Sequence, residues 1–198
     1  DLSGFLLQYN NRLGSVSLEE NGVFYILRTN IGNSLTKGLE AFGEYAFQLS
    51  DAVHCNIFTS TAFFKARYQD AAVRAGDKNT DISGNKLESV PDVITRNGLT
   101  VKYSRLNESA LYSYTAETFA DPLNTVTPSA NGSVGLVPAY GLLDLNASFR
   151  IYNNMRLRVS VNNVTDKQYF TKRPTFYPGP GIWPSDGRSI VATLSVKL

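Results

Sequence analysis

The feature that most constrains this chain is an alternation of apolar and polar residues with a period of two, most regular at the C-terminal end. Successive side chains of a β-strand point to opposite faces, so this pattern predicts a strand with one apolar and one polar face. In the last segment the apolar set is Ile190, Ala192, Leu194, Val196 and Leu198, and the polar set is Ser189, Thr193, Ser195 and Lys197.

The same alternation recurs along the chain and predicts an all-β fold of about eight antiparallel strands. No segment shows the period of about 3.6 that marks an amphipathic helix, and no apolar run approaches the ~18 residues of a membrane-spanning helix. Besides the last segment, the predicted strands cover residues 4–13, 38–49, 57–68, 99–105, 110–119, 141–151 and 155–162.

The connections between these segments alternate in length. Short links are expected near residues 50–52, 105–108 and 152–154, and long links near residues 14–22, 70–97, 120–138 and 165–186. Short turns at one end and long loops at the other are the layout of a transmembrane β-barrel of the outer-membrane type. A soluble sandwich gives no reason for loops to be sorted in this way.

The composition fits a barrel wall. Charged residues make up 18% of the chain, below the roughly 25% of soluble proteins. The 11 Tyr and 11 Phe suit strands and the aromatic girdles at membrane interfaces. A Lys or Arg at mid-depth on the lipid face would cost roughly 2–4 kcal/mol, so charged strand residues are expected to face the lumen. These are Glu40, Glu44, Lys65, Arg67, Arg156 and Arg158.

Several function classes find no support in the residues. The net charge of +2 gives no basic stripe of the kind that binds nucleic acid. The only histidine and the only cysteine are His54 and Cys55, too few for a metal site. No Ser, His and Asp set suggests a catalytic triad. The chain is therefore expected to be no enzyme, and to need no metal or cofactor of its own.

Five short motifs are spread over residues 30–189. They are Asn30 to Ser34 followed by Lys37 to Glu40, Phe119 to Asp121 with Asn124-Thr125, Pro138-Ala139-Tyr140 with Asp144-Leu145, the run Asn162 to Phe170, and Gly187-Arg188-Ser189. In this order they resemble motifs of the C-terminal third of TonB-dependent outer-membrane receptors. Within that family, residues 172–174 and 177–184 look most like ferric citrate receptors.

The resemblance implies a 22-stranded barrel, of which residues 1–198 would supply the last eight strands. It implies a location in the outer membrane of a Gram-negative bacterium, in contact with outer-membrane lipid. The partners would be the earlier strands, an N-terminal plug domain, and the TonB complex acting through that plug. The function would be capture of an extracellular iron chelate, a siderophore or ferric citrate, for energised uptake into the periplasm.

An anionic chelate calls for Arg or Lys donors and rigid aromatic walls. The long loop at 165–186 offers Lys172, Arg173, Tyr177 and Trp183. The other long loops offer Arg74 and Asn124. These six residues are the candidate ligand-binding set. The alternative is that they hold the loops together and never touch a ligand.

Two other classes of protein remain open on the sequence. One is a self-contained eight-stranded barrel with a structural or adhesion role, because eight strands close a barrel that side chains just fill. The other is a soluble β-sandwich that binds a ligand such as a sugar, with its polar faces in water. Inside the family, a receptor for cobalamin or glycans would have the same barrel strands.

Expression of residues 1–198 without detergent should give aggregate. In water the apolar faces of the strands would be exposed, and large exposed apolar patches drive association. Size-exclusion chromatography of the product with and without detergent measures this. A soluble monomer in plain buffer would contradict the membrane interpretation and favour the sandwich.

Overall fold

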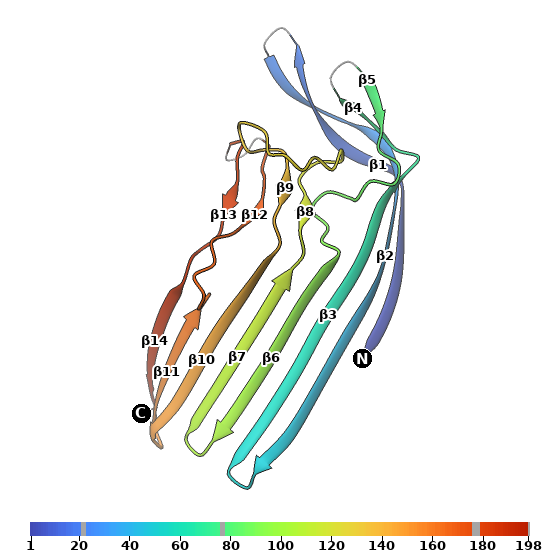
Figure 1. Ribbon diagram of the computed structural model, residues 1–198. Coiled ribbons are helices and arrows are strands. Elements are labelled where there is room, and N and C mark those ends of the chain that lie inside the picture. Colours follow the sequence, from blue (N-terminus) through green and yellow to red (C-terminus); the bar gives the residue numbers. More distant parts are fainter. Residues whose placement is uncertain (21–22, 76–77, 176–178, 198) are drawn as a thin grey trace.

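The computed structural model is an open sheet of eight antiparallel strands that lie side by side in chain order (Figure 1). It describes residues 1–20, 23–75, 78–175 and 179–197, and only the backbone of residues 15–20 and 23–27. The sheet consists of β1 (Leu2–Glu20), β2 (Val23–Ser50), β3 (Val53–Gln69), β6 (Val93–Tyr103), β7 (Leu106–Thr115), β10 (Tyr140–Tyr152), β11 (Met155–Asn162) and β14 (Ser189–Val196).

All eight predicted strands are present, and six of the seven connections between them have the predicted length, short at one end of the sheet and long at the other (Figure 1). Tight turns at residues 51–52, 104–105 and 153–154 join strands at one end of the sheet. Ser104 has a φ of 52°, a left-handed conformation that a tight reversal of the backbone requires. The segments 70–92, 116–139 and 163–188 make the long connections at the other end.

The predicted long loop at residues 14–22 is wrong. The first two strands continue through this segment, because β1 extends to Glu20 and β2 begins at Val23. They pair from Leu2↔Ala41 to Glu20↔Val23, with register shifts between Tyr9 and Leu13. The pair therefore rises beyond the remaining strands as a two-stranded ribbon (Figure 1).

Three small two-stranded sheets lie within the long connections. They are β4 (Ala72–Ala75) with β5 (Lys78–Asp81), β8 (Thr118–Phe119) with β9 (Leu136–Val137), and β12 (Phe170–Lys172) with β13 (Trp183–Pro184). The last pair places two short strands within the predicted long loop at residues 165–186. These two strands are only three and two residues long. Few ladder hydrogen bonds are therefore lost because Pro has no N–H group.

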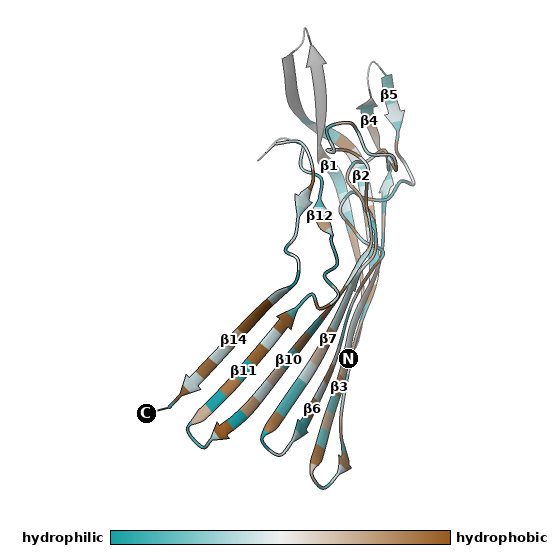
Figure 2. Ribbon diagram, turned by 60° about the vertical axis from the view of Figure 1, so that its left-hand side comes forward, coloured by the Kyte–Doolittle hydropathy of each residue, from teal (hydrophilic) through white to brown (hydrophobic). Residues whose placement is uncertain are grey.

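The register divides the sheet into two faces with different chemistry. Directly paired residues share a face, and the ladders from β2 to β14, which are regular except next to two of the tight turns, allow each face to be followed across the sheet. One row of the apolar face reads Phe47, Cys55, Val101, Glu108, Ala147, Val159 and Ala192. The neighbouring row of the polar face reads Gln48, His54, Lys102, Asn107, Ser148, Arg158 and Thr193. The bands of hydropathy along β10, β11 and β14 follow this alternation (Figure 2).

The apolar face has polar interruptions on β3, β6 and β7. Glu108 lies in the row just above the tight turns. Four residues of β3 and β6 form a second group, in which the hydroxyl of Thr59 donates to the Asn97 side chain at 2.8 Å and the hydroxyls of Thr61 and Thr95 are 2.7 Å apart. Because these groups bond one another, they are suited to a face without water.

The register contradicts the predicted direction of Lys65 and Arg67. Lys65 pairs with Lys37 and Arg67 pairs with Leu35, so both lie on the apolar face, opposite to Glu40 and Glu44. Arg156 and Arg158 lie on the polar face as predicted. Phe58 and Phe64 of β3 therefore lie on the polar face of the sheet, because the pairing of β3 with β2 and β6 determines the face of each side chain.

The buried hydrophobic cluster lies at the loop end of the sheet, where β2 and β3 meet the connection 70–92. The sheet is a single layer, so most of its large apolar side chains are exposed, whereas the folded connection covers the ends of two strands. The cluster contains Ile31, Ala66, Tyr68, Ala71, Val73, Ile82 and Leu87. The connection over β2 and β3 is thus anchored by an apolar core.

This architecture disagrees with both alternatives outside the family. A sandwich needs two facing sheets, whereas the eight long strands form one. A self-contained barrel needs its first and last strands to pair. In the part of the chain that the structure describes, β1 pairs only with β2 and β14 pairs only with β11.

Gly32→Ala should loosen the connection 70–92. Gly32 has a φ of 119°, and an added Cβ would lie 2.4 Å from the Cα of Ala71 and 2.4 Å from the carbonyl oxygen of Asp70. The positive φ alone strains an alanine by about 1–3 kcal/mol at either glycine, and at Gly32 the two overlaps must also displace residues 70 and 71. Amide exchange of Ile82 and Leu87, whose N–H groups donate to this region, should accelerate. Gly84→Ala is the control, because Gly84 has a φ of 87° with open space around it. Equal exchange in both variants would contradict the close approach.

Candidate ligand-binding site

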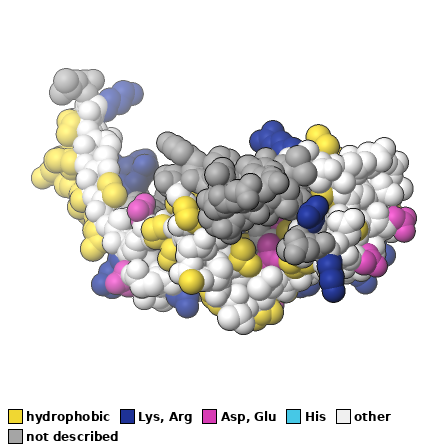
Figure 3. All heavy atoms as spheres, turned by 90° about the horizontal axis from the view of Figure 1, so that it is seen from above, with side chains coloured by type: hydrophobic (Ala, Val, Ile, Leu, Met, Phe, Trp, Pro, Cys, Tyr) yellow, Lys and Arg dark blue, Asp and Glu magenta, His cyan; other side chains and the backbone are white. Residues whose placement is uncertain are grey.

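The candidate residues all belong to the connections at the loop end of the sheet. Seen from that end, Lys and Arg side chains emerge at several separate places around the described loops (Figure 3). Among the described residues, no helix is long and apolar enough to cross a membrane. The same residues contain no group of three or more His, Cys, Asp and Glu side chains that could hold a metal ion.

Lys172 and Trp183 are brought together by the small sheet β12–β13. They are direct cross-strand partners, so their side chains emerge on the same side of the ribbon. Both are exposed, and Trp183 keeps 52% of its surface open to solvent. An exposed indole beside an ammonium group combines an apolar wall with a positive charge. Among the candidates that the structure describes, these two lie side by side on the surface.

Arg173 is bonded to the backbone of another connection. Its Nε donates to the carbonyl oxygen of Leu136 at 3.0 Å, and a terminal nitrogen donates to that of Gly132 at 2.8 Å. The guanidinium also lies 4.8 Å from the ring centroid of Phe170. These contacts join the connection 163–188 to the connection 116–139. Arg173 therefore positions the loop that carries Lys172 and Trp183.

Asn124 also holds two connections together. Its side-chain oxygen accepts from the N–H of Lys86 at 2.7 Å, and its amide nitrogen donates to the carbonyl oxygen of the same residue at 2.8 Å. Asn85 adds a bond from its side chain to the carbonyl oxygen of Pro122 at 2.9 Å. A φ of 57° at Asn124 aims the side chain at this target. The amide is thus satisfied by the backbone of another loop.

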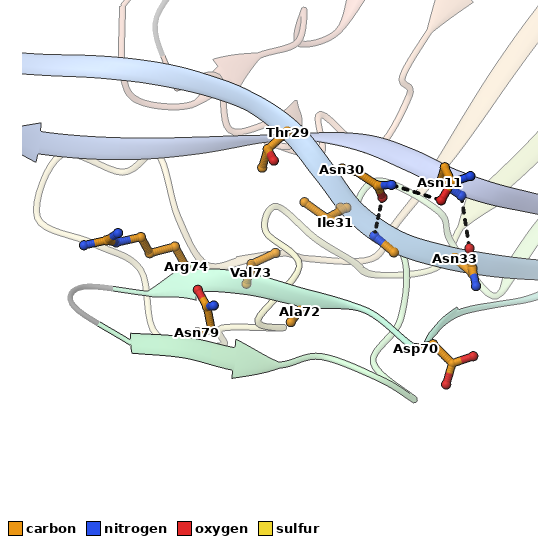
Figure 4. A pocket seen from close by; sticks show the side chains of 11 residues that line it. Asn11, Thr29, Asn30, Ile31, Asn33, Asp70, Ala72, Val73, Arg74 and Asn79 are labelled. Atoms are coloured by element: carbon orange, nitrogen blue, oxygen red, sulfur yellow. Dashed lines mark hydrogen bonds between the residues drawn. The ribbon is translucent and has the colours of Figure 1, made fainter.

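Arg74 lines a groove of about 570 Å³ between the small sheet β4–β5 and the strands β1 and β2. Figure 4 shows its side chain on one side of the groove with Asn79, and Thr29 and Asn30 across from it. Asn11, Asn30 and Asn33 are bonded among themselves and to the backbone at the β1–β2 irregularity, at 2.9–3.0 Å. The wall of the groove that these asparagines form is polar. Arg74 belongs to the connection 70–92, whereas Lys172 and Trp183 belong to the connection 163–188.

Glu88 forms a polar centre beside the buried cluster. Its carboxylate accepts a hydrogen bond from the hydroxyl of Tyr68 and lies 3.7 Å from the guanidinium of Arg12. The three residues tie β1, β3 and the connection 70–92 into one unit.

Tyr177 lies outside the described residues, as does Leu198. The predicted set therefore separates into a surface pair, Lys172 and Trp183, two loop-holding residues, Arg173 and Asn124, and a groove residue, Arg74. The sequence analysis missed the asparagines of the groove and the Arg12–Glu88 contact. The Asn-rich run at residues 30–33 was the available signal for the former. Nothing in the sequence pairs Arg12 with Glu88 across the chain.

An open sheet with one apolar face, one polar face and its loops gathered at a single end defines a wall segment of a membrane β-barrel receptor. Comparison with known families agrees with this class. The family model described as TonB dependent receptor-like, beta-barrel, matches residues 1–164. The chain belongs to the TonB-dependent receptor family, and the predicted resemblance is confirmed.

The relatives include receptors for iron chelates. The probable TonB-dependent siderophore receptor PiuA of Acinetobacter baumannii is 28% identical over 116 residues, which are 58% of this chain and 14% of that protein. The crystal structure of PiuA superposes with a TM-score of 0.66 and 21% identity, over 98% of this chain and 26% of that one. The unliganded ferric citrate transporter FecA superposes with a TM-score of 0.75 and 22% identity, over 98% and 28%.

These likenesses define the fold of the chain. The copper transporter OprC also superposes, with a TM-score of 0.65 and 17% identity over 98% of this chain and 29% of that one. Proteins named for different cargoes thus share this wall segment. The chain spans 14% of the length of the curated relative it matches, and 26–28% of the PiuA and FecA structures.

Asn124→Gly should release the connection 116–139 from the connection 70–92. Glycine tolerates the positive φ, so the change isolates the two lost hydrogen bonds to Lys86. Leaving those partly buried backbone groups unpaired costs about 1–3 kcal/mol. Trypsin cleavage after Lys86 in the folded receptor should become faster. Asn153→Gly, in an exposed turn at the opposite end, is the control. An unchanged cleavage rate would show that the amide does not hold the loops.

Proposed function

We propose that this chain is the C-terminal part of an outer-membrane, TonB-dependent receptor that captures an extracellular iron chelate. The chelate would be a ferric siderophore or ferric citrate, taken up into the periplasm by an energised movement. The observation that carries this is the exposed Lys172 and Trp183 pair, held at the loop end of a family barrel by Arg173. The relatives named as receptors for siderophores and ferric citrate support the same class of ligand.

The edges of the sheet support further barrel strands as partners. β1 and β14 each have a single neighbour among the described strands, so one row of backbone N–H and C=O groups on each is open. In a bilayer those groups must be paired within the protein, and a closed barrel achieves this. The remaining strands of a full receptor would supply the pairing, and a plug domain inside the barrel would connect it to the TonB complex.

The location follows from the two faces. The apolar face would contact the hydrocarbon of the outer membrane, and the polar face would line the lumen. The ferripyoverdine receptor of the outer membrane of Pseudomonas aeruginosa superposes with a TM-score of 0.64 and 17% identity over 98% of this chain and 24% of that one. The long connections would then lie outside the cell, where a chelate arrives.

Trp183→Ala in the complete receptor should weaken ferric citrate binding about thirtyfold, the loss of a central aromatic contact of about 2 kcal/mol. Lys172→Gln should weaken it less, through the loss of one charge. Titration calorimetry in detergent measures both. Tyr152→Ala removes an aromatic ring that is also exposed but lies at the tight-turn end, and should have no effect.

Three outcomes decide between the ligands. Unchanged ferric citrate affinity in Trp183→Ala would contradict the site. Binding of a catecholate siderophore but not of ferric citrate by the wild-type receptor would retain the iron-chelate class and reject citrate. Binding of cobalamin or a glycan alone would overturn the proposed function.

A further inference from the structure

The apolar face carries a group of cations at its loop end. In the regularly paired part of the described sheet, its Lys and Arg residues are Lys37, Lys65 and Arg67. Lys37 and Lys65 are direct cross-strand partners, and Arg67 follows Lys65 by two residues on the same face. Both lysines are exposed, and Arg67 is half-buried. The cations thus form one compact group on β2 and β3.

Like charges in direct cross-strand positions repel each other, because their Cβ atoms are only about 4.5–5.5 Å apart. No carboxylate of the described chain relieves this repulsion, since neither lysine forms an ion pair there. Lys86, which faces Arg67 across an isolated bridge, is paired with Asp92. The residues of the same face around the lysine pair are Leu6, Leu35, Leu39 and Phe63. An external anion would offset this charge.

The height of the group matches the edge of a bilayer. Twelve residue steps separate Val53 from Lys65 along β3, which is about 40 Å of strand. Barrel strands tilt by about 35–45°, so the rise is about 30 Å, and the apolar band of such barrels is about 25 Å tall. Phe63, 48% exposed, lies one row below Lys65, as an aromatic girdle residue would. The lysines therefore lie where hydrocarbon gives way to headgroups.

We propose that Lys37, Lys65 and Arg67 bind the phosphate group of an anionic lipid at the outer boundary of the membrane. The inference rests on the membrane location proposed above, and it concerns the outer surface of the barrel, away from the chelate site. Ammonium and guanidinium groups are the donors that phosphate oxygens prefer, and the acyl chains of the same lipid would cover Leu6, Leu39 and Phe63. The site thus selects a molecule that has both an anionic headgroup and acyl chains.

The test uses the complete receptor in neutral detergent micelles, with phosphatidylglycerol as probe and native mass spectrometry as the measurement of bound lipid. Each basic residue near a membrane surface strengthens anionic-lipid binding about fivefold. Lys37→Gln with Lys65→Gln should therefore weaken retention roughly thirtyfold. Lys102→Gln is the matched control, because Lys102 is an exposed lysine on the polar face, and it should leave retention unchanged.

Two further measurements distinguish the phosphate of a lipid from free inorganic phosphate. Phosphatidylcholine should be retained weakly and equally by the wild type and the double variant, because its headgroup is neutral overall. Millimolar inorganic phosphate should displace phosphatidylglycerol poorly, because it lacks the acyl chains. Equal retention of phosphatidylglycerol by the wild type and the double variant would overturn the proposal, and so would its complete displacement by inorganic phosphate.

The chelate assay separates this proposal from the proposed function. Ferric citrate binding by the double variant should equal that of the wild type, which also shows that the variant is folded. Loss of lipid retention with intact chelate binding supports the lipid site. If the wild type retains phosphatidylglycerol as described but binds no chelate, the lipid site stands and the proposed ligand fails.

Discussion

The pairing register of the eight-stranded sheet is the constraint on which the rest of the structure depends. A shift of one residue would move every side chain of a strand to the other face. The ladders from β2 to β14 run without such a shift through their central parts. The register therefore sets the apolar face, the polar face and the exceptional position of the cations on β2 and β3.

The loop end is organised by contacts between connections. Arg173 joins the connection 163–188 to 116–139, and Asn124 joins 116–139 to 70–92. The buried cluster and Glu88 anchor the last of these to β1, β2 and β3. The three connections therefore form a continuous hydrogen-bonded cap, and Lys172 and Trp183 are presented on its surface. Under the proposed function, this order would arrange the binding surface before a ligand arrives.

The strands could be predicted because the alternation of β10, β11 and β14 is a local property of the sequence. The face on which Lys65 and Arg67 lie could not be predicted, because β3 carries apolar residues on both of its faces. Only the pairing of β3 with β2 and β6 decides which of them belongs to the apolar face of the sheet. The long β1–β2 ribbon was missed although residues 21–22 are Asn-Gly, a two-residue hairpin signal. For the site, the sequence identified suitable donors. The sequence could not show that the donor groups of Arg173 and Asn124 already bond to backbone carbonyl oxygens of other loops.

The central claim is that alternate residues of this sheet face lipid and lumen. Spin labels at single cysteines in a Cys55→Ala background of the complete receptor test it most directly, with relaxation by oxygen reporting lipid and relaxation by a nickel chelate reporting water. Labels at Leu157, Val159 and Val161 should respond to oxygen, and labels at Arg158 and Ser160 should respond to nickel. On β3, position 63 should respond to oxygen and position 58 to nickel. Responses without alternation, or with the two faces exchanged, would contradict the account.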